Sequence, residues 1–195
     1  MMDSVKSPGE ELVIADLRER DLPAARAIYN DVIATTTAVY SDEPVSADYW
    51  AEWFAGRRAR GFPVLAAYHG GELIGFGSFG DFRPWPGYVT TVEHSVHVRA
   101  DRRRHGAGMR LVQALMARAA ASGKHVMIAG IDAENLASLA LHERLGFVEV
   151  GRLPAVARKF DRWLDLVYLH RALDRHRQVA TGFGRNASTH TRKSG

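Results

Sequence analysis

The sequence contains no cysteine, which excludes disulfide bonds, a cysteine nucleophile and thiolate metal sites. It also has no apolar run approaching the roughly 20 residues that a membrane helix needs. Residues 1–11 are polar and hold no apolar segment of the kind found in signal peptides. We therefore expect a cytoplasmic protein with no membrane partner.

Acidic residues are missing from residues 175–195, which carry five Lys or Arg side chains. Because the whole chain of 195 residues has a net charge of +4, the remainder is close to neutral. Five basic residues without aromatic stacking platforms predict only weak, salt-sensitive attraction to nucleic acid, so we predict no nucleic-acid partner. The composition also predicts a flexible N-terminus over 1–10, one domain over 11–173 and a disordered basic tail over 174–195.

Hydrophobic periodicity within residues 11–173 alternates between the patterns of strands and helices. The predicted order of elements is βααβββαβαββ, which indicates an α/β domain with a mixed sheet rather than a repeated βαβ barrel. Strands are predicted at 12–17, 63–68, 72–79, 90–98, 125–131, 147–156 and 164–173, and helices at 21–34, 46–61, 106–122 and 135–145.

One glycine pattern matches the sequence of a nucleotide-binding motif but lacks the structural context of that motif. Residues 75–80 read Gly-Phe-Gly-Ser-Phe-Gly, but the dinucleotide motif needs a strand, a turn and then a helix. These glycines fall inside a predicted strand, and Pro84 follows shortly after. We interpret them as a bulged strand to which another backbone or a ligand comes close.

A second glycine-rich segment has the right context for an anion site. Residues 103–108, Arg-Arg-His-Gly-Ala-Gly, lie between a predicted strand and a predicted helix. Glycines let backbone N–H groups face outward, and a helix N-terminus carries partial positive charge. The segment therefore predicts a pyrophosphate site, flanked by arginines.

This segment resembles the acyl-CoA signature of the GNAT N-acetyltransferases, and a second GNAT element follows in Asn135-x-x-Ser138 and residues 141–147. Residues 28–31, 36–40, 80–84, 91–98 and 159–165 are further similar to the phosphinothricin acetyltransferase subfamily, which includes the methionine sulfoximine and methionine sulfone acetyltransferases. The resemblance covers roughly residues 11–173.

The resemblance implies the GNAT fold. That fold is a mixed, mostly antiparallel central sheet with flanking helices and a splayed strand pair that binds acyl-CoA. Acetyl-CoA is then the co-substrate, and the residues implied to bind it are Val96, His97, Val98, Arg103, Arg104, His105, Gly106, Ala107, Gly108, Met109 and Asn135.

The implied reaction is attack of a primary amine on the acetyl-CoA thioester, for which a base must remove a proton. Glu93 is the candidate base, and a partly apolar cleft would raise its pKa. His142 occupies the position where many GNAT enzymes carry a tyrosine that protonates the departing thiolate, and histidine can act as acid or base near neutral pH. The sequence leaves open which of the two takes the amine proton.

The acceptor is expected to be a small anionic amino-acid analogue, because Arg83 offers a fork for a carboxylate or phosphinate. Phe82 stands where relatives often have tryptophan, which leaves the exact substrate open. The residues predicted to line the acceptor side are Thr36, Tyr40, Arg83, Pro84, Trp85, Tyr88, Glu93, His94, Ser95 and Lys159.

No metal site is predicted, since there is no HExxH motif and His94 and His97 fall on opposite faces of one strand. The resemblance suggests a homodimer, for which the sequence offers Trp50, Trp53 and Phe54 as apolar surface unless they belong to the core.

Two alternatives to this function stay open. One is a GNAT enzyme that acetylates another amino acid or a peptide N-terminus. Polyamines are disfavoured, because Arg83 and Lys159 would repel them. The other alternative is an acyl-CoA-binding regulator without turnover, which would not need both Glu93 and His142.

Overall fold

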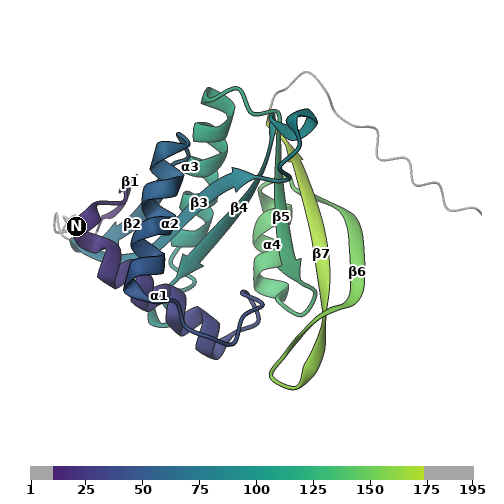
Figure 1. The fold of residues 1–195 in the computed structure, drawn as a ribbon, viewed down its shortest axis with the longest axis horizontal. Coiled ribbons are helices and arrows are strands. Elements are labelled where there is room, and N and C mark those ends of the chain that lie inside the picture. The colour runs from purple at the N-terminus through teal and green to yellow at the C-terminus, as the bar shows by residue number, and fades with distance from the viewer. Residues whose placement is uncertain (1–10, 174–195) are drawn as a thin grey trace, which may run out of the picture.

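The computed structural model describes residues 11–173 (Figure 1). The segments predicted as a flexible N-terminus and a basic tail lie outside the described residues. The predicted order of strands and helices is confirmed, with bounds β1 Leu12–Asp16, α1 Leu22–Thr35, α2 Ala47–Ala59, β2 Val64–His69, β3 Glu72–Asp81, β4 Thr91–Val98, α3 Ala107–Ala121, β5 Val126–Asp132, α4 Leu136–Arg144, β6 Val148–Lys159 and β7 Arg162–Ala172.

The seven strands form one sheet in the order β1-β2-β3-β4-β5-β7-β6. Every neighbouring pair is antiparallel except β4 and β5, which run parallel. Helices α1 and α2 cover one face at the β1 to β4 end, and α3 and α4 pack on the other face (Figure 1). The predicted mixed, mostly antiparallel sheet with flanking helices is therefore confirmed.

Helices α1 and α2 turn an apolar stripe toward the sheet. Ser46 begins α2 by accepting a hydrogen bond from the Tyr49 backbone N–H at 3.1 Å, as expected of an N-cap serine. Trp50 is 3% exposed and Phe54 is 4% exposed, and both pack against β2 and β3. Their alternative role as dimer surface is therefore wrong, because burying these large rings stabilises the core.

Helix α3 fills the other face of the sheet. Val112, Leu115 and Ala119 are buried against the sheet, whereas Met109 is only half-buried. Leu111 is also fully buried, because a helix packed closely against a sheet buries a wide apolar arc. Within residues 11–173, none of the helices has the length and apolar character needed to cross a membrane.

The glycines at 75 and 77 lie inside β3, as the sequence predicts, and the β2–β3 register slips by one residue beside Gly75. A Cβ on Gly77 would lie 2.8 Å from Val96 Cγ2 and 2.9 Å from the Ser95 carbonyl oxygen. The missing side chains therefore let β4 approach β3 closely, which is the structural role predicted for this pattern.

Replacing Gly77 by Ala should lower the free energy of unfolding by about 1–3 kcal/mol, because the added methyl group overpacks the β3–β4 contact. The measurement is urea unfolding at equilibrium. The matched control is Gly56→Ala in α2, where a Cβ meets nothing within 4 Å and the helix should gain up to about 1 kcal/mol. Equal stability of the Gly77→Ala variant and the wild type would contradict the expected overpacking.

Candidate active site

The two central strands separate halfway along their length. Strands β4 and β5 pair only at Thr91 with Val126, at Val92 with Met127, and at Glu93 with Ile128. Both strands then continue, so the β5-facing edge of β4 has no strand partner beyond Glu93. Unpaired backbone groups of this kind need a hydrogen-bonding partner. The predicted splayed strand pair is therefore present.

Helix α3 begins beside this opening. Its N-cap, Gly106, has a left-handed φ of 83°, and a Cβ there would meet nothing within 4 Å. The first backbone N–H groups of a helix have no partner within the helix, and its dipole favours anions. Arg103 is held nearby, because its Nε donates to the Val98 carbonyl oxygen at 3.3 Å. The loop therefore has the donors and the open space that an anion site requires.

Glu93 is the last residue of β4 that pairs with β5, and it lies half-buried opposite Gly80 of β3. Its carboxylate extends over the glycine at position 130 of β5, where a Cβ would come within 3.1 Å of Oε1. Burial raises the pKa of Glu93, and the positive charge of Arg83 partly opposes this rise. A carboxylate with a raised pKa is suited to accept a proton near neutral pH.

The loop after β3 supplies the cation and an aromatic wall. The Arg83 guanidinium lies 4.7 Å from the centre of the Phe82 ring. That ring in turn meets Tyr88 and Tyr168, with centroid distances of 5.8 and 6.2 Å. Arg83 and Glu93 therefore belong to one polar site with an aromatic side. Pro84 and Trp85 are exposed on the same loop, and the Trp85 side chain is 69% exposed.

Two residues of this site were missed by sequence reasoning. Tyr168 of β7 lies directly opposite Gly130 of β5, and a Cβ on Gly130 would lie 3.1 Å from Glu93 Oε1 and 3.6 Å from the Tyr168 ring. The signal for Gly130 is an isolated glycine in a buried strand, which often marks a close approach. Nothing in the local sequence distinguishes Tyr168 from other strand tyrosines, because only the register brings it to the site.

His94 lies on the face of β4 opposite to Glu93 and Ser95. It is buried against α4, and its Nε2 lies 3.2 Å from Nε2 of His142. Ser95 is exposed and shares the face of Glu93. The structure therefore places Ser95 on the face of β4 that carries Glu93, and His94 with His142 on the buried opposite face.

His142 has both ring nitrogens occupied. Its Nδ1 lies 2.7 Å from the Ser138 carbonyl oxygen, and its Nε2 faces His94. Burial lowers the pKa of His142. In this geometry no N–H of His142 is free to donate, so its role as an acid stays a prediction.

The predicted acyl-CoA residues His97 and Asn135 both have structural partners. The His97 ring meets Tyr29 and Phe76 at centroid distances of 5.1 and 5.2 Å, and burial lowers its pKa to about 4. The Asn135 side chain accepts from the Ser138 backbone N–H at 3.2 Å and so caps α4. Any contact of these two residues with a ligand therefore involves the His97 backbone or the side-chain NH2 group of Asn135.

Lys159 is engaged inside the protein. Its side chain is almost fully buried, and Nζ donates to the carbonyl oxygens of Ile33 at 2.6 Å and Val39 at 2.8 Å. Burial lowers the pKa of Lys159. The ammonium stabilises the C-terminal end of α1, so it is not the free second cation that the sequence suggested.

Thr36 and Tyr40 serve the same segment after α1. The Thr36 hydroxyl donates to the Val32 carbonyl oxygen at 2.8 Å, and the Tyr40 hydroxyl donates to the Asp165 carbonyl oxygen at 3.4 Å. Burial, with the charges of Asp132 and Asp165, raises the pKa of Tyr40 to about 12. Both hydroxyls therefore hold the segment in place. Neither of the two hydrogen bonds that they donate reaches Glu93.

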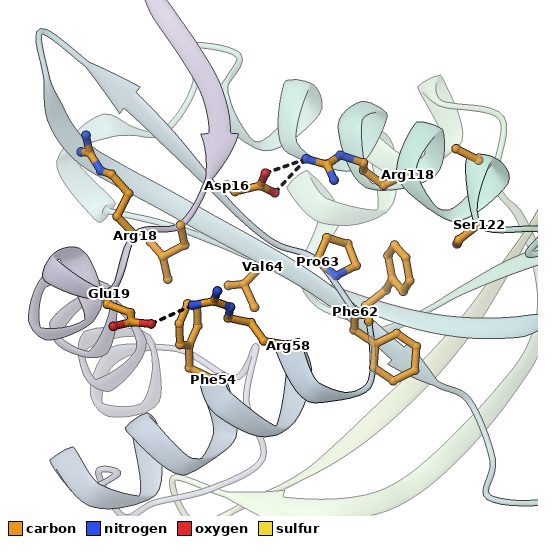
Figure 2. Close-up of a pocket in the computed structure, with 14 residues that line it drawn as sticks. Asp16, Arg18, Glu19, Phe54, Arg58, Phe62, Pro63, Val64, Arg118 and Ser122 are labelled. Carbon is orange, nitrogen blue, oxygen red and sulfur yellow. Dashed lines mark hydrogen bonds and ion pairs between the residues drawn. The ribbon is translucent and has the colours of Figure 1, made fainter.

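A hollow of about 720 Å³ lies elsewhere, where the ends of β1, α2 and α3 meet (Figure 2). Ion pairs cross it, from Arg118 to Asp16 at 2.8 Å and from Arg58 to Glu19 at 2.7 Å. None of the predicted site residues lines it. The charges of these four residues are therefore paired with one another rather than free for a substrate.

A sheet opened between two parallel strands, a glycine-rich helix start beside the opening and a half-buried carboxylate at its edge are features of an acetyltransferase. The family model described as "Acetyltransferase (GNAT) family" matches residues 25–147. The chain belongs to this family and is an enzyme of the acetyltransferase class.

Among relatives, the chain is 48% identical to the L-methionine sulfoximine/L-methionine sulfone acetyltransferase of Pseudomonas paraeruginosa, over 83% of this chain and 94% of that protein. Among solved structures, an N-acetyltransferase from Staphylococcus aureus is 41% identical, with a TM-score of 0.83 over 84% of this chain and 99% of that one. A phosphinothricin acetyltransferase from Sinorhizobium meliloti, solved in complex with AcCoA, is 31% identical, with a TM-score of 0.80 over 83% and 88%.

Proposed function

We propose that the protein transfers the acetyl group of acetyl-CoA to the α-amine of a small anionic amino-acid analogue such as L-methionine sulfoximine, L-methionine sulfone or phosphinothricin. The observation that carries the proposal is the placement of Glu93 and Arg83 together at the edge of the β4–β5 opening. The names of the relatives from Pseudomonas and Sinorhizobium support the substrate class.

The residues around the opening fit acetyl-CoA. The unpaired edge of β4 at residues 96–98 offers backbone groups to an amide-containing arm, and the start of α3 offers N–H groups and open space at Gly106 to a pyrophosphate. When bound, acetyl-CoA supplies an activated acetyl group as a thioester. This fit rests on backbone groups, so it depends little on the side chains of residues 96–98.

Glu93 acts on the acceptor amine. Its carboxylate removes one proton from the ammonium form. The neutral nitrogen then forms a bond to the thioester carbonyl carbon as the carbon–sulfur bond breaks, and CoA leaves as a thiolate that takes up the second proton released by the nitrogen. Positioning of the amine supplies much of the rate, and Arg83 provides it by pairing with the acceptor's anionic group. Acetylation removes the positive charge of the amine, so the product no longer mimics an amino acid.

The function is tested by acetyl-CoA turnover measured as thiol release, which has no background from this cysteine-free chain. The acceptor panel is methionine sulfone, methionine sulfoximine, phosphinothricin, methionine and spermidine. Turnover on the first three and none on spermidine is the expected result. Acetyl-CoA binding without turnover on any of the five would reject this acceptor class.

A second copy of the chain is the partner we propose. Strand β6 lies at the edge of the sheet and leaves apolar side chains exposed, including Val148, Val150 and Val156. An exposed apolar edge strand needs a cover to avoid aggregation. We expect light scattering to give the mass of two chains and Val150→Glu to shift it toward one. A wild-type protein that is monomeric at micromolar concentration would contradict the dimer.

A further inference from the structure

The two buried imidazoles of His94 and His142 face each other across the contact between β4 and α4. Their rings are nearly stacked, with centroids 5.1 Å apart and an interplanar angle of 25°. His94 is 8% exposed and His142 is 6% exposed, and the Phe147 ring packs against both. The pair is therefore enclosed by apolar surroundings, where an imidazolium is unfavourable.

The hydrogen bonds of the pair allow one arrangement of protons. The Ser138 carbonyl oxygen can only accept, so Nδ1 of His142 at 2.7 Å carries the hydrogen. A neutral imidazole has one donor and one acceptor nitrogen, so Nε2 of His142 accepts. Nε2 of His94, 3.2 Å away, must then be the donor.

A separate observation agrees with this arrangement. If Nε2 of His94 carries the hydrogen, its Nδ1 is bare, and that atom is buried with no hydrogen-bond partner among the described residues. A bare nitrogen is better tolerated there than an N–H, because an unpaired buried donor is rarer than an acceptor that lacks a partner. Burial lowers the pKa of His94 to about 3, with smaller contributions from His142 and His97.

The position of His94 and His142 in the fold indicates what their hydrogen bond does. His94 is the first residue of β4 beyond the last pairing with β5, so it stands where the opening begins. His142 belongs to α4, the helix that follows β5. The hydrogen bond between the two rings therefore joins the β4 wall of the opening to the helix carried by the other wall.

We propose that His94 is a positioning residue, which holds His142 as its neutral Nδ1–H tautomer and ties α4 to β4 at the mouth of the β4–β5 opening. The inference rests on the proposed function, since the opening is where acetyl transfer takes place. It also deepens that function: both rings are neutral near neutral pH and each N–H is already engaged in a hydrogen bond, so the amine proton goes to Glu93 and the thiolate leaves unassisted by these histidines.

Within residues 11–173, the groups found to shift the pKa of either histidine include no carboxylate. The charges that act on His94 are those of His142 on α4 and His97 on its own strand, and at the start of β6 the neighbour is the apolar Phe147. On His142, the Ser138 backbone is the group that opposes burial. Burial outweighs this one hydrogen bond, so we expect both rings to be neutral between about pH 5 and pH 8.

The first test is nitrogen NMR of the full chain labelled at its nine histidines. Signals are assigned with His94→Gln and with His142→Gln. The expected result is one ring protonated at Nε2 and the other at Nδ1, both neutral from about pH 5 to pH 8, with scalar coupling between the two Nε2 nuclei. An imidazolium on either ring in this range, or His142 protonated at Nε2, would overturn the proposal.

The second test compares His94→Gln with His94→Leu. Glutamine keeps an N–H donor near the position of Nε2, whereas leucine keeps the volume alone. We expect leucine to lower kcat by up to about a hundredfold, as small misplacements do, and glutamine to restore most of it with His142 still protonated at Nδ1. Equal kcat in the leucine variant and the wild type would reject the positioning role.

The two tests separate this inference from the proposed function. The NMR result needs no substrate, so it stands or falls independently of the acceptor panel. Failure of every acceptor with the expected tautomers would reject the proposed acceptor class and leave the proton arrangement standing. If the leucine variant does not fold, the kcat of the glutamine variant decides: a loss as large as that of Glu93→Gln would overturn the proposal.

Discussion

Replacing Glu93 by Gln should lower kcat by about 100- to 10,000-fold, the usual contribution of a general base. The amide fills the same space over Gly130 but cannot take a proton. Acetyl-CoA binding should be unchanged, because the carboxylate is not part of the glycine-rich loop or of the unpaired β4 edge. Steady-state thiol release and equilibrium binding of acetyl-CoA measure the two quantities.

The pH dependence gives this variant a second readout. Because burial raises the pKa of Glu93, and the base works only when deprotonated, wild-type kcat/KM should fall with decreasing pH at a higher pH than for an ordinary glutamate. The kcat/KM of the variant should lack this decrease at low pH. It should rise at high pH, where the amine of the acceptor is already deprotonated. The control is Glu52→Gln, an exposed glutamate of α2. Full activity of Glu93→Gln at neutral pH would show that Glu93 is not the general base.

Replacing Arg83 by Gln should raise the KM for methionine sulfone by about 10- to 100-fold, since a hydrogen-bonded contact to a charged group contributes about 1.5–3 kcal/mol. The KM for acetyl-CoA should not change. Because the charge of Arg83 holds the pKa of Glu93 down, its loss should also move the acid limb of kcat to higher pH. Substrate kinetics at several pH values measure both effects.

The matched control at this position is Arg83→Lys. Lysine keeps the charge and loses the planar fork, so the acid limb should stay in place while KM rises by less than in the glutamine variant. An unchanged KM for methionine sulfone in Arg83→Gln would place the acceptor's anion away from the loop after β3. Lys159 could not then replace Arg83, because its ammonium is bound to Ile33 and Val39.

Most of the fold was predictable because periodicity is local. The apolar stripes of the helices and the alternation of the strands gave the right order of elements, with most bounds within a few residues. Strand β6 runs to Lys159 rather than ending at Val156, because β7 holds it across an irregular register between Leu153 and Ala157. Such pairing depends on the partner strand and has no local signal.

The candidate site was only partly predictable, for the same reason. The anion loop at 103–108 had its own signature, but the contact between Glu93 and Gly130 depends on the β4–β5 register. Period-two alternation alone places His94 on the face opposite to Glu93. The prediction that His94 lines the acceptor side together with Glu93 does not agree with this alternation. Lys159 resembled a free cation because a sequence cannot show which carbonyl groups surround an ammonium.

The most direct test of the account is identification of the product formed from acetyl-CoA and L-methionine sulfoximine, which offers both an α-amine and a sulfoximine nitrogen. Mass spectrometry counts the acetyl groups transferred, and NMR locates them. The account predicts one acetyl group on the α-nitrogen, formed in step with thiol release and lost in Glu93→Gln. Thiol release without an acetylated product, or acetylation at the sulfoximine nitrogen, would contradict it.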